Sequence, residues 1–175
     1  MRAIEPIAKF DLAFSLFCLQ NRFHYPISHL SKAISHTGDG HLYAVIGALA
    51  WWLGGEVGKL FLLLGLFAFT IELPIYWLSK NLFKRRRPQE LTPLISSFIT
   101  PSDRYSLPSG HTAAAFLMAV LISHCFPSLA GIAFVWATLI AFARILLGVH
   151  FLTDVILGAL LGIACARVAL QWLGS

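Results

Sequence analysis

Long apolar stretches dominate the sequence and limit what this chain can fold into. They cover residues 42–53, 60–78, 112–126, 129–147 and 150–173. Apolar runs of roughly 17–25 residues are typical of helices that cross a bilayer. Hydrophobic residues make up 58% of the chain and charged residues only 12%. We therefore expect residues 1–175 to form one all-α domain, a polytopic membrane helix bundle with about five to six transmembrane helices.

The first 36 residues have a mixed composition and are expected to form an interfacial N-terminal segment. Phe10, Phe14 and Phe17 recur at helical spacing, which favours an amphipathic helix in the head-group layer. The segment is expected to form part of a lateral entrance for lipid, or to be a plain anchor, and to carry no chemistry. The sequence leaves open whether the first span begins near Ile27 or at Leu42.

The order of the spans brings distant polar residues to one face of the membrane. The end of the second span, the start of the third, the end of the fourth and the start of the fifth all lie there. The polar residues at these points are Lys80, Arg87, His111, Arg144 and His150. Ionisable groups at membrane depth are costly and usually functional. Their convergence therefore predicts a single site at this face.

The residue types at these points suit a phosphate group. Pro108-Ser109-Gly110 begins the third span, and a helix N-terminus offers unpaired N–H groups to an anion. Arginine presents a planar fork to phosphate oxygens and lysine a point charge. The predicted phosphate-binding residues are Lys80, Arg87, Ser109, Gly110 and Arg144.

Two histidines and one aspartate supply the elements of a nucleophilic mechanism. His150 and Asp154 are four residues apart and share a face if both are helical. A carboxylate that accepts from one ring nitrogen leaves the other free to attack. His150 is thus the candidate nucleophile, Asp154 its orienting partner and His111 the general acid. The alternatives are a plain cap for His111, a purely structural His150–Asp154 pair, and a snorkelling Arg144.

Two further features admit structural interpretations. The run Lys84-Arg85-Arg86 is typical of a juxtamembrane anchor for anionic lipid heads. Glu72, inside the second span, is expected to be a buried acid paired with a neighbour. If the site did need a divalent metal, Glu72 and Asp39 would be the first candidate ligands.

Lys80-x6-Arg87-Pro88, Pro108-Ser109-Gly110-His111 and Arg144-x5-His150-x3-Asp154 together resemble the three-part signature of the type 2 phosphatidic acid phosphatase superfamily. The resemblance covers about residues 39–173, the expected catalytic helix bundle. One departure is Ala143, where the family usually has a serine, and it removes a hydrogen bond but no charge. Vanadium haloperoxidases are similar around the same site, but they are soluble.

The resemblance implies hydrolysis of a membrane lipid phosphate or diphosphate through a phosphohistidine on His150. It implies no cofactor and no metal, and as partners a lipid phosphate substrate and the bilayer, without nucleic acid. The expected substrates are undecaprenyl diphosphate or phosphatidylglycerophosphate, with lipid A as an alternative. A different function class, a non-enzymatic protein that binds or translocates lipid phosphates, would need the cations but not the histidines.

The resemblance also implies a multi-pass protein of the bacterial inner membrane with its active site facing the periplasm. The distribution of charge disagrees, because most lysines and arginines lie at the active-site face. By the positive-inside rule that face would be cytoplasmic. Several of these cations have a catalytic reason to be there, which favours the periplasmic orientation.

Overall fold

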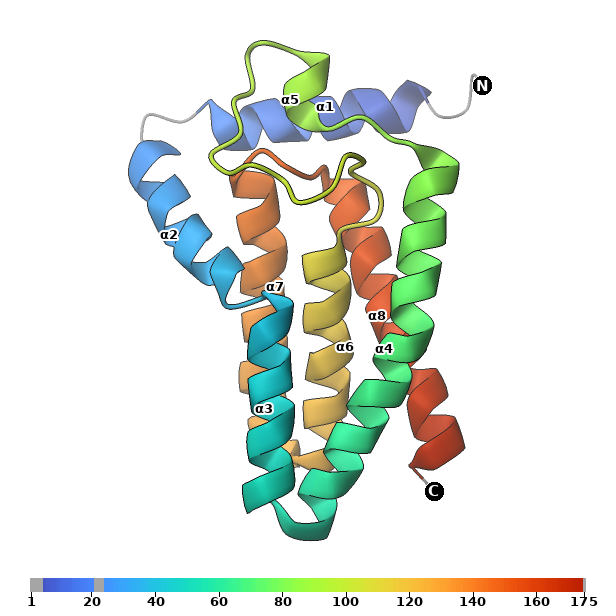
Figure 1. Cartoon of the computed structure of the whole chain (residues 1–175). Coiled ribbons are helices and arrows are strands. Elements are labelled where there is room, and N and C mark those ends of the chain that lie inside the picture. Colours follow the sequence, from blue (N-terminus) through green and yellow to red (C-terminus); the bar gives the residue numbers. More distant parts are fainter. Residues whose placement is uncertain (1–4, 21–23, 175) are drawn as a thin grey trace.

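The computed structural model describes residues 5–20 and 24–174, and five of its helices run side by side as a bundle (Figure 1). These helices are α3 (Gly40–Leu53), α4 (Gly55–Phe83), α6 (Gly110–Cys125), α7 (Ala130–Leu146) and α8 (Leu152–Leu173). Segments built on α4, α7 and α8 are long and apolar enough to cross a membrane, and α3 and α6 are shorter apolar helices. The predicted all-α membrane bundle is therefore confirmed.

The helix bounds correct three sequence expectations. Helix α2 (His24–His36) ends before a turn at residues 37–39, so the alternative start of the first span near Ile27 is wrong. Helix α4 extends to Phe83, beyond the predicted end at residue 78. Helix α8 begins at Leu152, because Phe151 has an extended backbone at the N-cap position. His150 consequently lies in the preceding turn and not on the helix.

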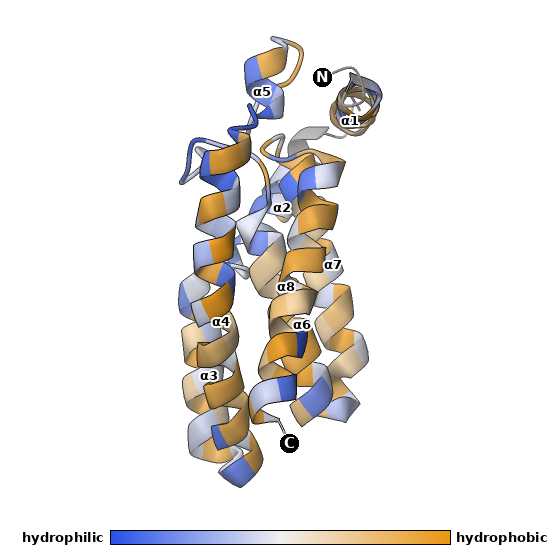
Figure 2. Cartoon of the chain, turned by 90° about the vertical axis from the view of Figure 1, so that its right-hand side faces the viewer, coloured by the Kyte–Doolittle hydropathy of each residue, from blue (hydrophilic) through white to orange (hydrophobic). Residues whose placement is uncertain are grey.

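The helices of the bundle consist mainly of hydrophobic residues along most of their length (Figure 2). Large side chains such as Trp52, Leu66 and Ile132 are exposed. In water such a surface would be a costly patch, whereas in a bilayer it contacts lipid chains. Polar residues concentrate at one end, where α5 (Pro88–Leu91) and the α4–α6 loop lie (Figure 2).

Helix α6 forms the centre of the bundle and packs against α4, α7 and α8. Its residues Ala113, Leu117 and Leu121 are completely buried. On α8, a Cβ atom at Gly158 would lie 2.5 Å from the Ser109 carbonyl oxygen, and one at Gly162 would lie 2.0 Å from that of Ala113. These glycines let the two backbones approach, as the small-xxx-small spacing predicted. The contact fixes the start of α8 beside the start of α6.

Helix α1 (Glu5–Leu19) lies across the polar end of the bundle (Figure 1). It buries Asp11, Ser15 and Leu19 against the bundle and exposes Phe10 and Phe17. The helix lies at the surface as expected, but the predicted aromatic stripe is divided: Phe10 and Phe17 face outwards, whereas Phe14 packs against a buried cluster of α7 and α8 residues.

The turn between α7 and α8 is held by the long α4–α6 loop. Gly148 has a φ of +73° and follows the C-cap of α7, as the sequence indicated. A Cβ there would lie 2.8 Å from the Ser96 carbonyl oxygen. The Phe98 N–H donates to the Leu147 carbonyl at 3.2 Å. The loop therefore packs directly on the turn that carries His150.

Candidate active site

The start of α6 places the second motif at the polar end. Ser109 is the N-cap, and its N–H donates to the Asp154 carbonyl at 3.0 Å. Its side chain is completely buried and its hydroxyl bonds to Thr112 at 2.9 Å. Gly110 lies against Tyr76, because a Cβ there would come within 2.8 Å of that ring. The backbone of Gly110 is therefore exposed at the site, whereas the Ser109 hydroxyl is already hydrogen-bonded to Thr112.

His150 and Asp154 lie together although His150 is not helical. The Asp154 carboxylate accepts from the Phe151 N–H at 2.8 Å and caps α8. His150 Nδ1 is 3.7 Å from Asp154 Oδ2, longer than a hydrogen bond, and has no other partner in the described ranges. Burial lowers the pKa of His150 to about 3, although Asp154 opposes this shift. The imidazole is therefore neutral at physiological pH, and the tautomer with its proton on Nδ1, towards Asp154, leaves the Nε2 lone pair free.

His111 also has a carboxylate partner, which the sequence did not assign to it. Its Nε2 lies 2.9 Å from Oδ1 of Asp39, the N-cap residue of α3. The other ring nitrogen, Nδ1, is not part of this contact, and His111 lines a cavity at this end of the bundle. A partly exposed imidazole that is oriented by a carboxylate suits proton transfer.

Two arginines have buried donors without acceptors. Arg87 Nη1 donates to the Val149 carbonyl at 2.6 Å, and Arg144 Nη1 donates to the Ser35 hydroxyl at 2.7 Å. The Nε atoms of both side chains are buried and have no partner in the described part of the chain. Unpaired buried donors are costly, and an anion bound between the two guanidinium groups would satisfy them.

Ser35 is relevant to position 143, where this chain has alanine and the family signature usually has serine. Ala143 is buried beside Arg144 and has no hydroxyl to offer. Ser35 reaches the arginine from α2 and accepts its hydrogen bond. The second helix therefore provides a hydroxyl partner for Arg144 from outside the motif.

Asp103 links the two cations of the first motif. Its Oδ1 lies 2.9 Å from Lys80 Nζ and 2.5 Å from Arg87 Nη2, and Oδ2 accepts from the Tyr76 hydroxyl at 2.5 Å. Burial disfavours its ionisation, but the bonds from Tyr76 and Lys80 and the charges of Lys80 and Arg87 outweigh this and lower its pKa. Lys80 also donates to the Tyr105 carbonyl at 2.5 Å. Lys80 is thus bound to the loop.

Arg85 is more than a lipid anchor. Its Nη1 donates to Asp154 Oδ1 at 2.8 Å and its Nη2 to Asp11 Oδ2 at 2.6 Å. Asp11 also accepts from the Thr153 N–H at 3.2 Å and from the Thr153 hydroxyl. Helix α1 is therefore connected through Arg85 to the partner of the predicted nucleophile.

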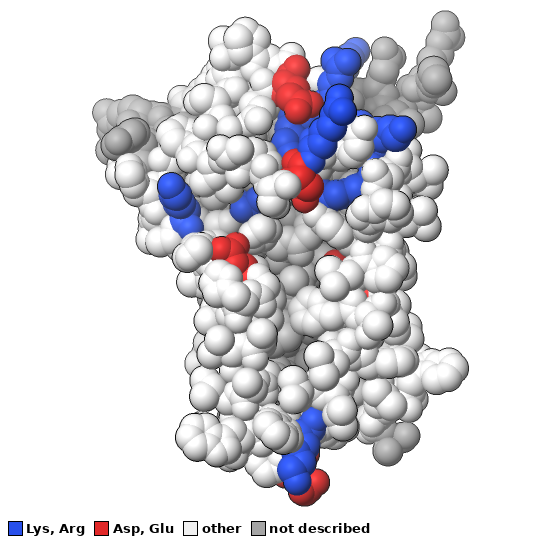
Figure 3. Space-filling view, viewed as in Figure 1, with Lys and Arg blue, Asp and Glu red and all other residues white. Residues whose placement is uncertain are grey.

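A cavity of about 430 Å³ joins the site to the interior of the bundle. At the polar end it is lined by Arg87, Gly110, His111, Arg144 and His150. It continues between α3, α4 and α6 past apolar residues, and Figure 3 shows the surface hollowed on this side. Lys80, Ser109 and Asp154 do not line this cavity.

Glu72 lines the same cavity, one helical turn from Tyr76. It is buried, as predicted, with 2% of its surface exposed. The predicted pairing is wrong, because no hydrogen bond or ion pair reaches its carboxyl group from the described residues. A second cavity, of about 580 Å³, shares His111 and Arg144 with the first and lies under α2 and residues 99–102.

The side chains that sequence reasoning missed are mostly carboxylates and their partners. Asp11 and Asp103 were not singled out, and Asp39 was named only as a metal ligand. One signal for these residues was visible in the sequence: acidic residues are scarce, because the chain has only eight of them. An acid near a membrane end is costly unless it is paired, so Asp11, Asp39 and Asp103 were each candidates for a cation or imidazole partner.

Comparison with known proteins agrees with this geometry. The family profile described as the PAP2 superfamily matches residues 56–175, more than half of the chain. The chain belongs to this superfamily. A probable lipid phosphate phosphatase beta from Arabidopsis thaliana is 31% identical over 142 residues, which cover 65% of this chain and 66% of that protein. The chain thus spans just under two thirds of the length of this PAP2 relative.

Two crystal structures share the fold along nearly the whole chain. LpxE of Aquifex aeolicus has a TM-score of 0.82 and 28% identity, covering 92% of this chain and 94% of that one. The PAP2-type phosphatidylglycerolphosphate phosphatase of Bacillus subtilis has a TM-score of 0.78 and 25% identity, covering 98% and 89%. Both therefore resemble this PAP2 chain in its helix layout.

Proposed function

We propose that this protein is a membrane phosphatase that hydrolyses a lipid phosphate or diphosphate without a metal ion. The observation that carries the proposal is one cavity lined by His111, His150, Arg87 and Arg144, in which both arginines have an Nε donor without a partner in residues 5–20 and 24–174. A protein that only bound lipid phosphates would need the cations. It would not need two imidazoles that each lie beside a carboxylate.

In the first step, His150 Nε2 attacks phosphorus and the bond to the lipid oxygen breaks. His111 donates a proton to that oxygen, and the lipid alcohol, or the lipid monophosphate from a diphosphate, leaves. The phosphate oxygens bind the guanidinium groups of Arg87 and Arg144 and the backbone N–H groups at Gly110. Asp154 stabilises the positive charge that forms on His150.

In the second step, His111 takes a proton from water while the water oxygen attacks the phosphohistidine. The N–P bond breaks, inorganic phosphate leaves, and both histidines return to their starting states. Charge stabilisation comes from side chains and backbone throughout. Hydrolysis is therefore expected to continue in the presence of EDTA.

The apolar continuation of the cavity supports a lipid as the substrate. A head group at the polar end would place its chain between α3, α4 and α6, among residues such as Phe61, Leu66 and Phe69. The substrates we favour are undecaprenyl diphosphate and phosphatidylglycerophosphate. The fold is shared with a phosphatidylglycerolphosphate phosphatase and, with a higher TM-score, with LpxE, so lipid A is tested beside these two substrates.

The test is phosphate release by purified full-length protein in detergent with EDTA. Undecaprenyl diphosphate, phosphatidylglycerophosphate, lipid A and phosphatidic acid are compared at equal mole fraction. We expect turnover of at least one of them and a loss of that turnover in Arg144→Ala. Binding of these lipids without phosphate release would instead support the non-enzymatic protein.

We further propose that the site faces the periplasm of a bacterial inner membrane. Lys80, Arg85 and Arg87 at the site end are paired with carboxylates, which weakens them as topology signals. The opposite end carries Lys59, paired with Glu56 at 2.7 Å. A green fluorescent protein fused after residue 175 should then fluoresce, because the C-terminus would be cytoplasmic. Activity of a C-terminal alkaline phosphatase fusion would contradict this orientation.

A further inference from the structure

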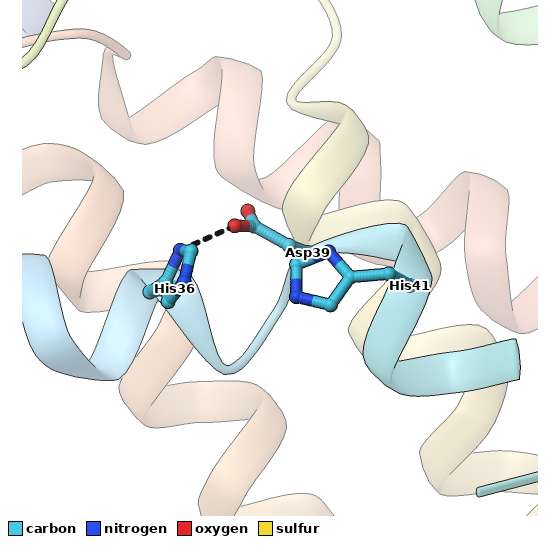
Figure 4. Close-up of side chains that lie close together, drawn as sticks. All are labelled: His36, Asp39 and His41. Atoms are coloured by element: carbon cyan, nitrogen blue, oxygen red, sulfur yellow. Dashed lines mark ion pairs between the residues drawn. The ribbon is translucent and has the colours of Figure 1, made fainter. Parts of the chain in front are cut away.

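The turn between α2 and α3 places three metal-ligating side chains together beside the catalytic cavity. His36 ends α2, Asp39 caps α3, and His41 lies in the first turn of α3. Figure 4 shows that these side chains lie close to one another, and their ligand atoms are all within 4.8 Å. Two imidazoles and one carboxylate within six residues form a compact ligand set.

The chemistry of this set suits a zinc-like ion. Zn²⁺ binds imidazole nitrogen at about 2.0–2.1 Å and carboxylate oxygen at about 2.0–2.2 Å, so its ligand atoms lie roughly 3.4 Å apart. His36 Nδ1 and Asp39 Oδ2 are already 2.5 Å apart. Small side-chain rotations would bring all three atoms to this spacing. His36 and His41 are exposed, so an ion can reach them from the aqueous phase.

We propose that His36, Asp39 and His41 bind one Zn²⁺ ion, with water in the remaining position, and that this ion inhibits the enzyme. Three protein ligands and an open position are common for zinc. Mg²⁺ and Ca²⁺ would bind poorly, because they prefer oxygen ligands. The ion takes no part in the reaction described above, but its ligand Asp39 also contacts His111.

The inhibition follows from the two oxygens of Asp39. Oδ2 faces His36, and Oδ1 lies 2.9 Å from His111 Nε2. An ion bound to Oδ2 turns the carboxylate towards His36 and His41 and weakens the contact of Oδ1 with His111 Nε2. The imidazole then loses the group that orients it towards the lipid oxygen, so proton transfer becomes slower. The inhibition rests on the proposed function, whereas the binding of the ion does not.

The experiment measures binding and turnover separately. Full-length protein stripped of metal is titrated with ZnCl₂ in detergent by calorimetry, and phosphate release is followed over the same concentrations. We expect one ion per chain and inhibition that EDTA reverses. The double variant His36→Gln/His41→Gln should bind at least about tenfold more weakly. Its inhibition constant should rise by the same factor, and its metal-free turnover should stay within about twofold of the parent.

His124→Gln is the matched control, because His124 is an exposed histidine in the last turn of α6, away from the site. It should bind and be inhibited like the parent. Absence of zinc binding in the parent, or equal binding by the double variant, would overturn the metal site. Binding at the site without inhibition would overturn its coupling to His111. If the parent releases no phosphate from any lipid, calorimetry still reads the metal site, so the two proposals fail separately.

Discussion

At the residue scale, carboxylates decide what each cation and imidazole of the site can do. Asp39 lies beside His111, Asp154 beside His150, and Asp103 between Lys80 and Arg87. Arg87 and Arg144 line the cavity, and each has a buried Nε donor without a partner among the described residues. We therefore expect these two cations to contact the phosphate most directly, whereas Lys80 does not line the cavity.

Replacing Asp39 tests whether it positions His111. Asp39→Asn keeps the size of the side chain but removes the charge that stabilises the imidazolium. We expect kcat to fall by up to about 100-fold, part of the contribution of a general acid, with little change in KM. Glutamate at the same position should recover part of the rate. A rise in KM with kcat unchanged would show that Asp39 acts in binding and not in proton transfer.

Asp103 gives a pH-dependent prediction. Its pKa is lowered in the folded protein, so its contribution to stability is complete above the unfolded value, near 4, and is lost as the pH falls through the folded value. Asp103→Asn should destabilise the protein by about 1–3 kcal/mol near pH 7. Thermal unfolding in detergent should show this difference shrinking towards pH 3. A difference that grows on acidification would contradict the assignment.

Sequence reasoning found the motif residues, because their spacing and their position at span ends are visible in the chain. It could not assign the partners of Asp39 and Asp103, since those contacts join segments far apart in sequence. His150 and Asp154 were expected to share a helical face. The structure brings them close through a capped helix start instead.

At the element scale, the α6–α8 contact fixes the positions of His111 and His150, the two histidines proposed to be catalytic. Gly162→Ala would place a Cβ atom 2.0 Å from the Ala113 carbonyl oxygen, so the helices must separate. We expect the free energy of unfolding to fall by about 1–3 kcal/mol, measured by thermal unfolding. We also expect reduced turnover, measured by phosphate release. Gly131→Ala is the control, because nothing lies within 4 Å of its Cβ position. Equal effects of the two substitutions would refute the role of this contact.

Helix α1 was expected to be an entrance or an anchor without chemistry. Neither cavity is lined by α1 residues within the described ranges, and Asp11 shares Arg85 with Asp154. We infer that α1 supports the site through this arginine.

Asp11→Asn tests that support. It should lower kcat for a soluble short-chain phosphate and for a long-chain lipid by similar factors, because both substrates use the same His150–Asp154 pair. Ser15→Ala is a matched substitution on the same buried face and leaves Arg85 paired. Loss confined to the long-chain lipid in bilayers would favour the entrance instead.

At the scale of the whole molecule, the five-helix bundle gathers one polar site at one end and leaves an apolar surface along the rest (Figures 2 and 3). The all-helical membrane bundle and the convergence of the motifs at one end followed from hydrophobic run lengths and crossing order. The bounds of α4 and α8 could not be predicted in this way, because capping and loop packing determine them. The cavity that extends from the site could not be read from the sequence, since it depends on how α3, α4 and α6 pack.

The central claim is covalent catalysis by His150 in a metal-free site. Purified protein is mixed in EDTA with a radiolabelled lipid phosphate that it hydrolyses, and is quenched rapidly in alkali. We predict label on the parent protein that is lost in acid, as expected for a phosphohistidine. His150→Ala should carry no label and lose turnover by several powers of ten. Substantial phosphate release by well-folded His150→Ala protein would contradict the account.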